Sequence, residues 1–209
     1  MNAHAAPARI ERLTVKNFRA MASVDIRDFT PLTVLLGPNG SGKSTVFDVF
    51  AFLSECFQSG LRQAWDRRGR ARELKTRGRT GPIMIEIKYR EQSTAPKSPL
   101  ISYHIEIEEV NGRPLVKREW LHWSRKGRGK PFRFMEYENG TGRVVSGEMP
   151  DEQDQREEVP LSSADTLAVS ALGQLAENPR VVSVRDFVMG WHLSYLSTDG
   201  PRRQPETGP

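Results

Sequence analysis

Apolar and polar residues alternate in two short stretches near the N-terminus, 12–16 and 23–27. This alternation is typical of strands with one buried face. The next segment, 32–36, is apolar at every position except Thr33 and runs directly into Gly37. A strand without a polar face is covered on both sides of its sheet. The pattern therefore predicts that 32–36 is a central, buried strand.

The spacing of apolar residues changes after Gly42, where they recur every three to four positions as in a helix. The apolar stripe consists of Val46, Val49, Phe50, Leu53 and Phe57. Gly60 is placed to end this helix. The following segment, 61–80, is rich in arginine, and we expect it to be helical in part.

Alternation returns over residues 83–90 and 101–107. Asn111-Gly112 then separates two alternating stretches, and this dipeptide is a strong signal for a two-residue hairpin turn. Asn139-Gly140 marks another turn. We therefore expect residues 82–146 to form an antiparallel meander of about five strands.

The segment beyond this meander begins with an acidic stretch. Residues 151–158 include five acidic side chains and are expected to form a solvated loop. Ser162 or Ser163 is placed to cap a helix that ends near Pro179. A second short helix is expected over residues 181–189.

The net charge of the 209-residue chain is +5 and is unevenly distributed. Residues 61–80 carry +6 and residues 113–133 carry +7, so the remainder is net acidic. Two basic blocks favour contact with a polyanion such as DNA or RNA, although solvated loops with scattered arginines have the same composition. The candidate nucleic-acid contacts are Arg67, Arg68, Arg70, Arg72, Arg125, Lys126, Arg128 and Lys130.

Composition argues against membrane and disulfide-rich proteins. The longest purely aliphatic run is Val34–Leu36, so no membrane span is expected. The N-terminus lacks the apolar segment of a secretory signal. The single Cys56 excludes an internal disulfide and a cysteine-rich zinc site. A reducing compartment and a cytoplasmic location are expected.

The octapeptide 37–44, Gly-Pro-Asn-Gly-Ser-Gly-Lys-Ser, matches the phosphate-loop pattern G-x-x-x-x-G-K-[ST]. Glycines let backbone N–H groups surround phosphate oxygens, and the N-terminus of the following helix favours anions. Lys43 is the expected catalytic cation at the β- and γ-phosphates of ATP, and Ser44 is the expected Mg²⁺ ligand. The predicted nucleotide-binding residues of the loop are Gly37, Pro38, Asn39, Gly40, Ser41, Gly42, Lys43, Ser44 and Thr45.

The flanks of the loop resemble one group of ATPases. The opening Leu13-Thr-Val-Lys-Asn-Phe-Arg19, a short strand, and the phosphate loop about 20 residues later are similar to the heads of RecF/SMC/OLD-like proteins. These belong to the wider ABC-type ATPases, and some bacterial members are described as AAA family ATPases. The resemblance covers most of residues 9–198 and is specific at the phosphate loop and the N-terminal strand.

The resemblance implies an α/β fold. It is that of a P-loop NTPase, here the N-terminal lobe of an ABC-type ATPase head, with an inserted antiparallel β-meander and a C-terminal helical segment. The expected organisation is a disordered N-terminus at 1–8, a nucleotide-binding core at 9–81, the meander at 82–146, an acidic loop and helical segment at 147–198, and a flexible tail at 199–209.

The resemblance also implies roles for three residues outside the loop. Arg19 matches a position that lies near the nucleotide in such heads, although a surface arginine has the same pattern. Gln174 corresponds to the glutamine that binds magnesium and orients the attacking water, or else it is an exposed helix residue. Arg62 corresponds to an arginine that approaches the nucleotide from the loop after the first helix.

The chain departs from this family in three elements. A complete head has an apolar strand ending in Asp-Glu (Walker B), an LSGGQ-like signature and a switch histidine, and none of them is identifiable here. Val181–Asp186 lacks the glutamate, and Leu161–Asp165 lacks the glycines. The expected partner is therefore a second copy of the chain or a polypeptide that supplies the missing half. An associated nuclease is a further expected partner, in DNA repair or anti-phage defence.

Two other functions stay open at this point. A non-hydrolysing module would bind nucleotide and nucleic acid without turnover. A complete P-loop kinase would transfer the γ-phosphate to a small substrate, but kinases do not usually place a long antiparallel meander after the first helix.

Overall fold

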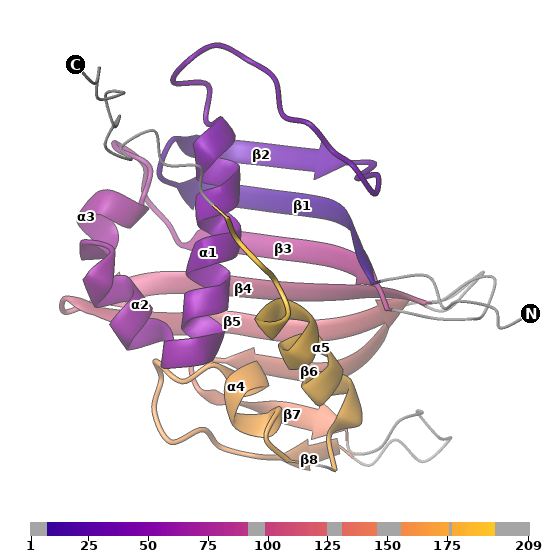
Figure 1. Cartoon of the computed structure of the whole chain (residues 1–209). Coiled ribbons are helices and arrows are strands. Elements are labelled where there is room, and N and C mark those ends of the chain that lie inside the picture. Colours follow the sequence, from indigo (N-terminus) through magenta and orange to yellow (C-terminus); the bar gives the residue numbers. More distant parts are fainter. Residues whose placement is uncertain (1–7, 92–98, 125–130, 146–155, 176, 195–209) are drawn as a thin grey trace, which may run out of the picture.

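One antiparallel sheet organises the part of the chain that the computed structural model describes, which is residues 8–91, 99–124, 131–145, 156–175 and 177–194. Its strands lie in the order β2-β1-β3-β4-β5-β6-β7-β8, with β2 and β8 at the two edges (Figure 1). Every pairing between these strands is antiparallel. The strands are β1 (Arg9–Phe18), β2 (Met21–Arg27), β3 (Ile83–Arg90), β4 (Leu100–Val110), β5 (Arg113–Ser124), β6 (Phe132–Glu138), β7 (Thr141–Val145) and β8 (Arg156–Glu158).

The two Asn-Gly dipeptides form the hairpin turns that their sequence predicts. Asn111 and Gly112 join β4 to β5 with φ values of 52° and 74°. Asn139 and Gly140 join β6 to β7 with φ values of 51° and 83°. A two-residue turn of this type needs positive φ at both positions, which asparagine and glycine tolerate best. Strands β3 to β7 thus follow one another through the region for which a meander is expected.

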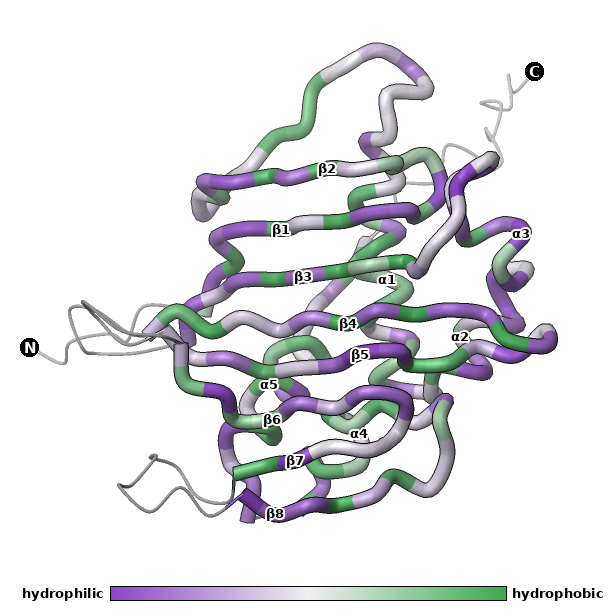
Figure 2. Tube along the Cα trace, turned by 180° about the vertical axis from the view of Figure 1, so that it is seen from behind, coloured by the Kyte–Doolittle hydropathy of each residue, from purple (hydrophilic) through white to green (hydrophobic). Residues whose placement is uncertain are grey.

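The helices of the described residues lie on one face of the sheet (Figure 1). Figure 2 shows the opposite side, where the strands lie in front of the helices. Helix α1 begins directly after Gly42 and ends before Gly60, as its apolar spacing predicts. None of these helices is long and apolar enough to cross a membrane. They are α1 (Lys43–Ser59), α2 (Leu61–Arg67), α3 (Arg70–Leu74), α4 (Ala168–Leu172) and α5 (Pro179–Met189).

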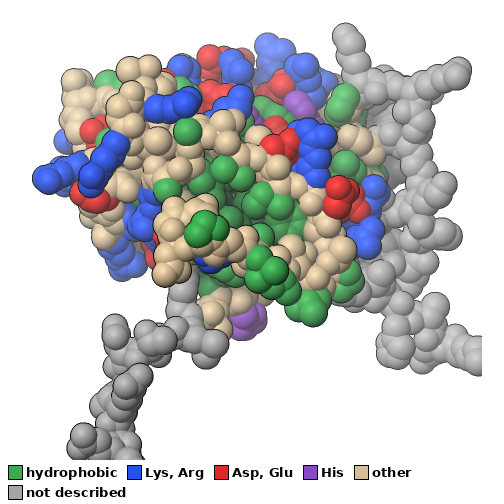
Figure 3. Space-filling view, turned by 90° about the horizontal axis from the view of Figure 1, so that it is seen from above, with side chains coloured by type: hydrophobic (Ala, Val, Ile, Leu, Met, Phe, Trp, Pro, Cys, Tyr) green, Lys and Arg blue, Asp and Glu red, His purple; other side chains and the backbone are tan. Residues whose placement is uncertain are grey.

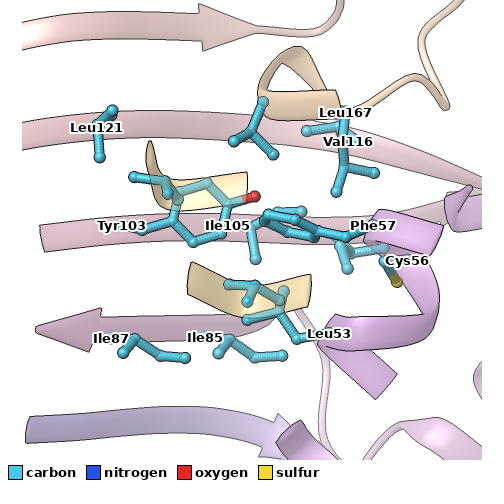
Figure 4. Close-up of a cluster of buried hydrophobic side chains, with 14 of the residues drawn as sticks. Leu53, Cys56, Phe57, Ile85, Ile87, Tyr103, Ile105, Val116, Leu121 and Leu167 are labelled. Carbon is cyan, nitrogen blue, oxygen red and sulfur yellow. The ribbon is translucent and has the colours of Figure 1, made fainter. Parts of the chain in front are cut away.

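The core fills the space between the sheet and α1. Residues of β3 alternate between buried and partly buried along the strand, so one face points to the helices. The ring of Phe57 on α1 meets the ring of Tyr103 on β4 edge to face at 5.5 Å. Each large apolar side chain buried in this way contributes about 1.5–3 kcal/mol. The cluster in Figure 4 includes Leu53, Cys56, Phe57, Ile85, Ile87, Tyr103, Ile105, Val116, Leu121 and Leu167.

Helix α5 covers the same face beside α1. Phe187 of α5 stacks on Tyr89 of β3 at 4.0 Å, and Trp191 meets Phe50 of α1 edge to face at 5.2 Å. Arg180 is held by Glu91 at 3.1 Å. These aromatic contacts explain why a helix is present close to the 181–189 range that the sequence predicts.

A buried carboxylate fixes α4 to the sheet. Glu119 of β5 is 0% exposed and accepts hydrogen bonds from the backbone N–H groups of Ala168 (2.6 Å) and Val169 (2.9 Å) and from the hydroxyl of Tyr103 (2.9 Å). The expectation that Ser162 or Ser163 caps a longer helix is wrong. The helix is one short turn, and a strand distant in the sequence satisfies its first N–H groups.

The expectation of a central, buried strand at 32–36 is also wrong. The segment forms no strand, and Leu32, Val34 and Leu36 are 81%, 65% and 88% exposed. It lies beyond β2, the edge of the sheet (Figure 1). The apolar pattern indicates a segment suited to burial, but no described strand is present to pair with it.

The acidic region contains a second difference. Arg156–Glu158 forms the edge strand β8, paired with β7, where a solvated loop is expected. Residues 151–155 lie outside the described residues, as do 1–7 and 195–209. The expected disordered N-terminus, flexible tail and first part of the acidic loop fall on these residues.

We expect the ionisation of Glu119 to make the fold less stable at alkaline than at mildly acidic pH. Burial raises the pKa of this carboxyl from 4.5 to about 7, and the hydrogen bonds it accepts offset only part of that increase. The folded state therefore binds the proton more tightly than the unfolded chain does. This contribution to the free energy of unfolding is complete below the pKa that the glutamate has in the unfolded chain. It is lost as the pH rises through about 7, the pKa of Glu119 in the folded protein.

Urea unfolding of the wild type and of Glu119→Gln at about pH 5 and about pH 8 measures this effect. Glutamine does not titrate, so the free energy of unfolding of the variant should lack a pH-dependent part of up to about 3 kcal/mol that the wild type has. An equal loss of stability in both proteins between the two pH values would show that Glu119 is not its source.

Candidate nucleotide-binding site

The predicted phosphate loop leads directly into the first turn of α1. Gly40 and Gly42 adopt left-handed backbone with φ of 81° and 88°, and Gly42 is the N-cap of the helix. A Cβ at Gly37 would come within 2.9 Å of the Ser41 hydroxyl. The loop therefore requires glycine at positions 40 and 42 for conformation, and little space is open beside Gly37.

The N-terminus of α1 is open to an anion. No side chain caps it, and its first turn contains no acidic residue. The first backbone hydrogen bond in the helix is donated by Val46 to Gly42. The preceding N–H groups lie at the positive end of a 17-residue helix, which is the arrangement that binds phosphate groups.

The Lys43 side chain folds back over the loop. Its Nζ donates to the carbonyl oxygens of Gly37 and Pro38, both at 2.7 Å. The ammonium group therefore lies over the backbone of the loop. A bound nucleotide would exchange these two carbonyl contacts for stronger contacts with charged phosphate oxygens.

The residues present fit ATP with Mg²⁺. The Ser44 residue is exposed at the loop end of α1, whereas Thr45 is buried. Among the described residues, no group of three or more His, Cys, Asp or Glu side chains forms a metal site. In a loop of this pattern the Ser44 hydroxyl would be the group that holds Mg²⁺. The ion, when bound, neutralises charge on the phosphates.

The structure brings Arg19 to the same end of α1. Its Nη1 donates to Oδ2 of Asp48 at 2.8 Å, and Asp48 lies one helical turn after Ser44. The preceding Asn17 holds this turn in place with side-chain bonds to the 76–82 segment. Sequence reasoning missed Asn17 and Asp48, although the Asn-Phe-Arg tripeptide marks the turn.

Gln174 and Arg62 are not brought to the loop. Arg62 lines an open pocket of about 670 Å³ with Ser59, at the C-terminal end of α1, and residues of α4 line the same pocket. Gln174 follows α4 and is exposed. Helix α1 has 17 residues and is about 25 Å long. In this arrangement Gln174 does not lie beside Ser44.

The predicted nucleic-acid contacts on the α2–α3 segment differ in their surroundings. Arg68 donates two hydrogen bonds of 2.8 Å to Glu55 and is only 13% exposed. Arg70 pairs with Asp66 at 2.7 Å, and Arg72, which is 92% exposed, lies 3.6 Å from the Glu73 carboxylate. Arg67 is exposed beside the same turn and lines two of the surface pockets. The other predicted contacts, Arg125, Lys126, Arg128 and Lys130, lie outside the described residues.

An apolar surface lies next to the phosphate loop. Leu32, Val34 and Leu36 precede the loop in sequence, and Phe47 follows it on α1 with 47% exposure. Figure 3 looks down on this end of the molecule and shows hydrophobic side chains gathered at the surface. An apolar group of this kind beside a functional loop is typical of an interaction site.

A family model described as an AAA ATPase domain matches residues 9–149 of the 209-residue chain. The matched span contains the phosphate loop, the turn that carries Arg19, and strands β1 to β7. It covers more than half of the chain, and nucleotide binding is what this family implies for the loop. The chain therefore belongs to the AAA ATPase domain family.

Proposed function

We propose that this chain is the ATP-binding lobe of a RecF/SMC/OLD-like, ABC-type ATPase. The observation that carries the proposal is the phosphate loop. The loop combines left-handed glycines, the ammonium of Lys43 and the uncapped start of α1 in one short stretch of chain. Backbone N–H groups and one cation bind the phosphates of ATP, and Ser44 contributes to the Mg²⁺ site.

We further propose that the lobe works with a second half. The 32–36 segment is apolar and exposed and has no paired strand among the described residues. A strand from a second polypeptide or a second copy would cover it and bring a carboxylate to the nucleotide. Phosphoryl transfer depends on positioning and charge stabilisation, so the lobe alone binds ATP but turns it over slowly.

The proposed setting is DNA repair or anti-phage defence, with DNA or RNA as a binding partner and a nuclease as an associated protein. The exposed guanidinium of Arg72 suits contacts with backbone phosphates, which position a nucleic acid without reading its sequence. Arg68 is less suited to this role because Glu55 already engages it.

We expect Lys43→Ala to weaken ATP binding by about tenfold or more, because a charge-assisted contact to the phosphates is lost while the backbone loop remains. Titration with a fluorescent ATP analogue in the presence of Mg²⁺ measures the affinity. Lys88→Ala removes a lysine from the face of β3 that points away from the helices. This variant is the matched control and should leave the ATP affinity unchanged. Equal affinities for wild type and Lys43→Ala would remove the phosphate-loop assignment.

We also expect the purified chain to release phosphate from ATP far more slowly than about 1 s⁻¹, the low end for kinases. The loop supplies a cradle and a hydroxyl, but the proposed second half supplies the group that polarises water. Steady-state phosphate release is the measurement, with Lys43→Ala as the background. Turnover near 1 s⁻¹ that disappears in that variant would mean that the chain is a complete enzyme.

A further inference from the structure

The ion pair between Arg19 and Asp48 joins the turn between β1 and β2 to the phosphate-loop half of α1. The side chains are 33% and 24% exposed, and their single hydrogen bond measures 2.8 Å. Only one nitrogen of the guanidinium has an acceptor on Asp48. The pair is therefore not the two-bond arrangement that Arg68 makes with Glu55 further along α1.

The backbone under Arg19 is fixed. Arg19 has φ of 47°, and its N–H donates to the carbonyl of Leu74 at 2.7 Å. Asn17 has φ of 59°, is 5% exposed and donates to the Gly81 carbonyl at 2.8 Å. Phe18 between them is fully buried. Non-glycine residues keep left-handed backbone only where the surroundings impose it. Movement at this site is thus restricted to the Arg19 side chain.

The resting position of this side chain leaves a donor unsatisfied. The Nε of Arg19 is buried and has no acceptor within hydrogen-bond distance among the described residues. An unpaired buried donor is unfavourable. The Arg19 side chain is 33% exposed, so its guanidinium is not enclosed by the protein. A stronger acceptor within reach would draw it away from Asp48.

The phosphate site provides such an acceptor. Ser44 and Asp48 are four residues apart and lie on the same face of α1, about 6 Å along the helix axis. Phosphate oxygens carry more negative charge than one carboxylate and accept two parallel bonds from a guanidinium. Arg19 therefore starts one helical turn from the ligand that would bind it better.

We propose that Asp48 competes with the nucleotide for Arg19: it holds the guanidinium one turn away from the phosphate loop, and bound ATP takes it over. This inference rests on the proposed function. Because ATP must first displace a bound carboxylate, Asp48 lowers the affinity of the free protein for nucleotide. The effect of the ion pair is thus to weaken ATP binding.

The test is a double-mutant cycle read as ATP affinity. Asp48→Asn should tighten binding by about two- to fivefold, the range for a partly exposed ion pair. Arg19→Gln should weaken it by about tenfold. In the Arg19→Gln background, Asp48→Asn should change nothing, because no guanidinium is left to release. Asp48→Ser is measured beside Asp48→Asn so that the result does not depend on one substitution.

Glu91→Gln is the matched control, since it breaks another partly exposed arginine–carboxylate pair, that of Glu91 after β3 with Arg180 of α5, and should leave ATP affinity unchanged. Melting temperatures without nucleotide show whether each variant is folded. Weaker or unchanged binding by both Asp48 variants would overturn the inference, as would the same gain in the Arg19→Gln background. If Lys43→Ala binds ATP as well as the wild type does, the proposed function fails instead.

Discussion

The packing of α1 across the apolar face of the antiparallel sheet is the contact on which the rest of the structure depends. A one-layer sheet has a single apolar face that must be covered, and α1 covers its centre with Leu53, Cys56 and Phe57. The same packing fixes where the helix begins. Because α1 runs from the β2 side of the sheet toward α2, its N-terminus and the phosphate loop lie at one end of the molecule (Figure 1).

Glu119 of β5 joins α4 to the sheet that α1 covers. This carboxylate satisfies the start of α4 from within β5 and receives the Tyr103 hydroxyl from β4. A buried polar group without hydrogen-bond partners is unfavourable. The burial of the Glu119 carboxylate therefore depends on all three donors being in place. The segment that carries α4 and α5 is therefore held to the same core as α1 rather than forming a separate unit.

The candidate site is built at an edge and not in the centre of the sheet. Its loop follows the exposed 32–36 segment, and its neighbour Arg19 comes from the turn between β1 and β2. The turn is rigid because Asn17 and Phe18 anchor it, while the loop is open to solvent. The proposed function needs a loop that a nucleotide and a second protein surface can both reach, and the exposure of nearly all of residues 32–41 provides this.

The sequence by itself determined the local features of this protein. Residue types and spacing predict the phosphate loop, the limits of α1, the two Asn-Gly turns and the meander. They can do so because short segments decide both the backbone conformation at glycine and asparagine and the burial of one face. Only the tertiary structure decided four other features. They are the cap of α4 by Glu119, the exposure of 32–36, the pairing of Arg19 with Asp48, and the distance of Gln174 from the loop. Each of these depends on which distant segment lies opposite, and an apolar or charged side chain specifies the kind of partner it needs without specifying where in the chain that partner is.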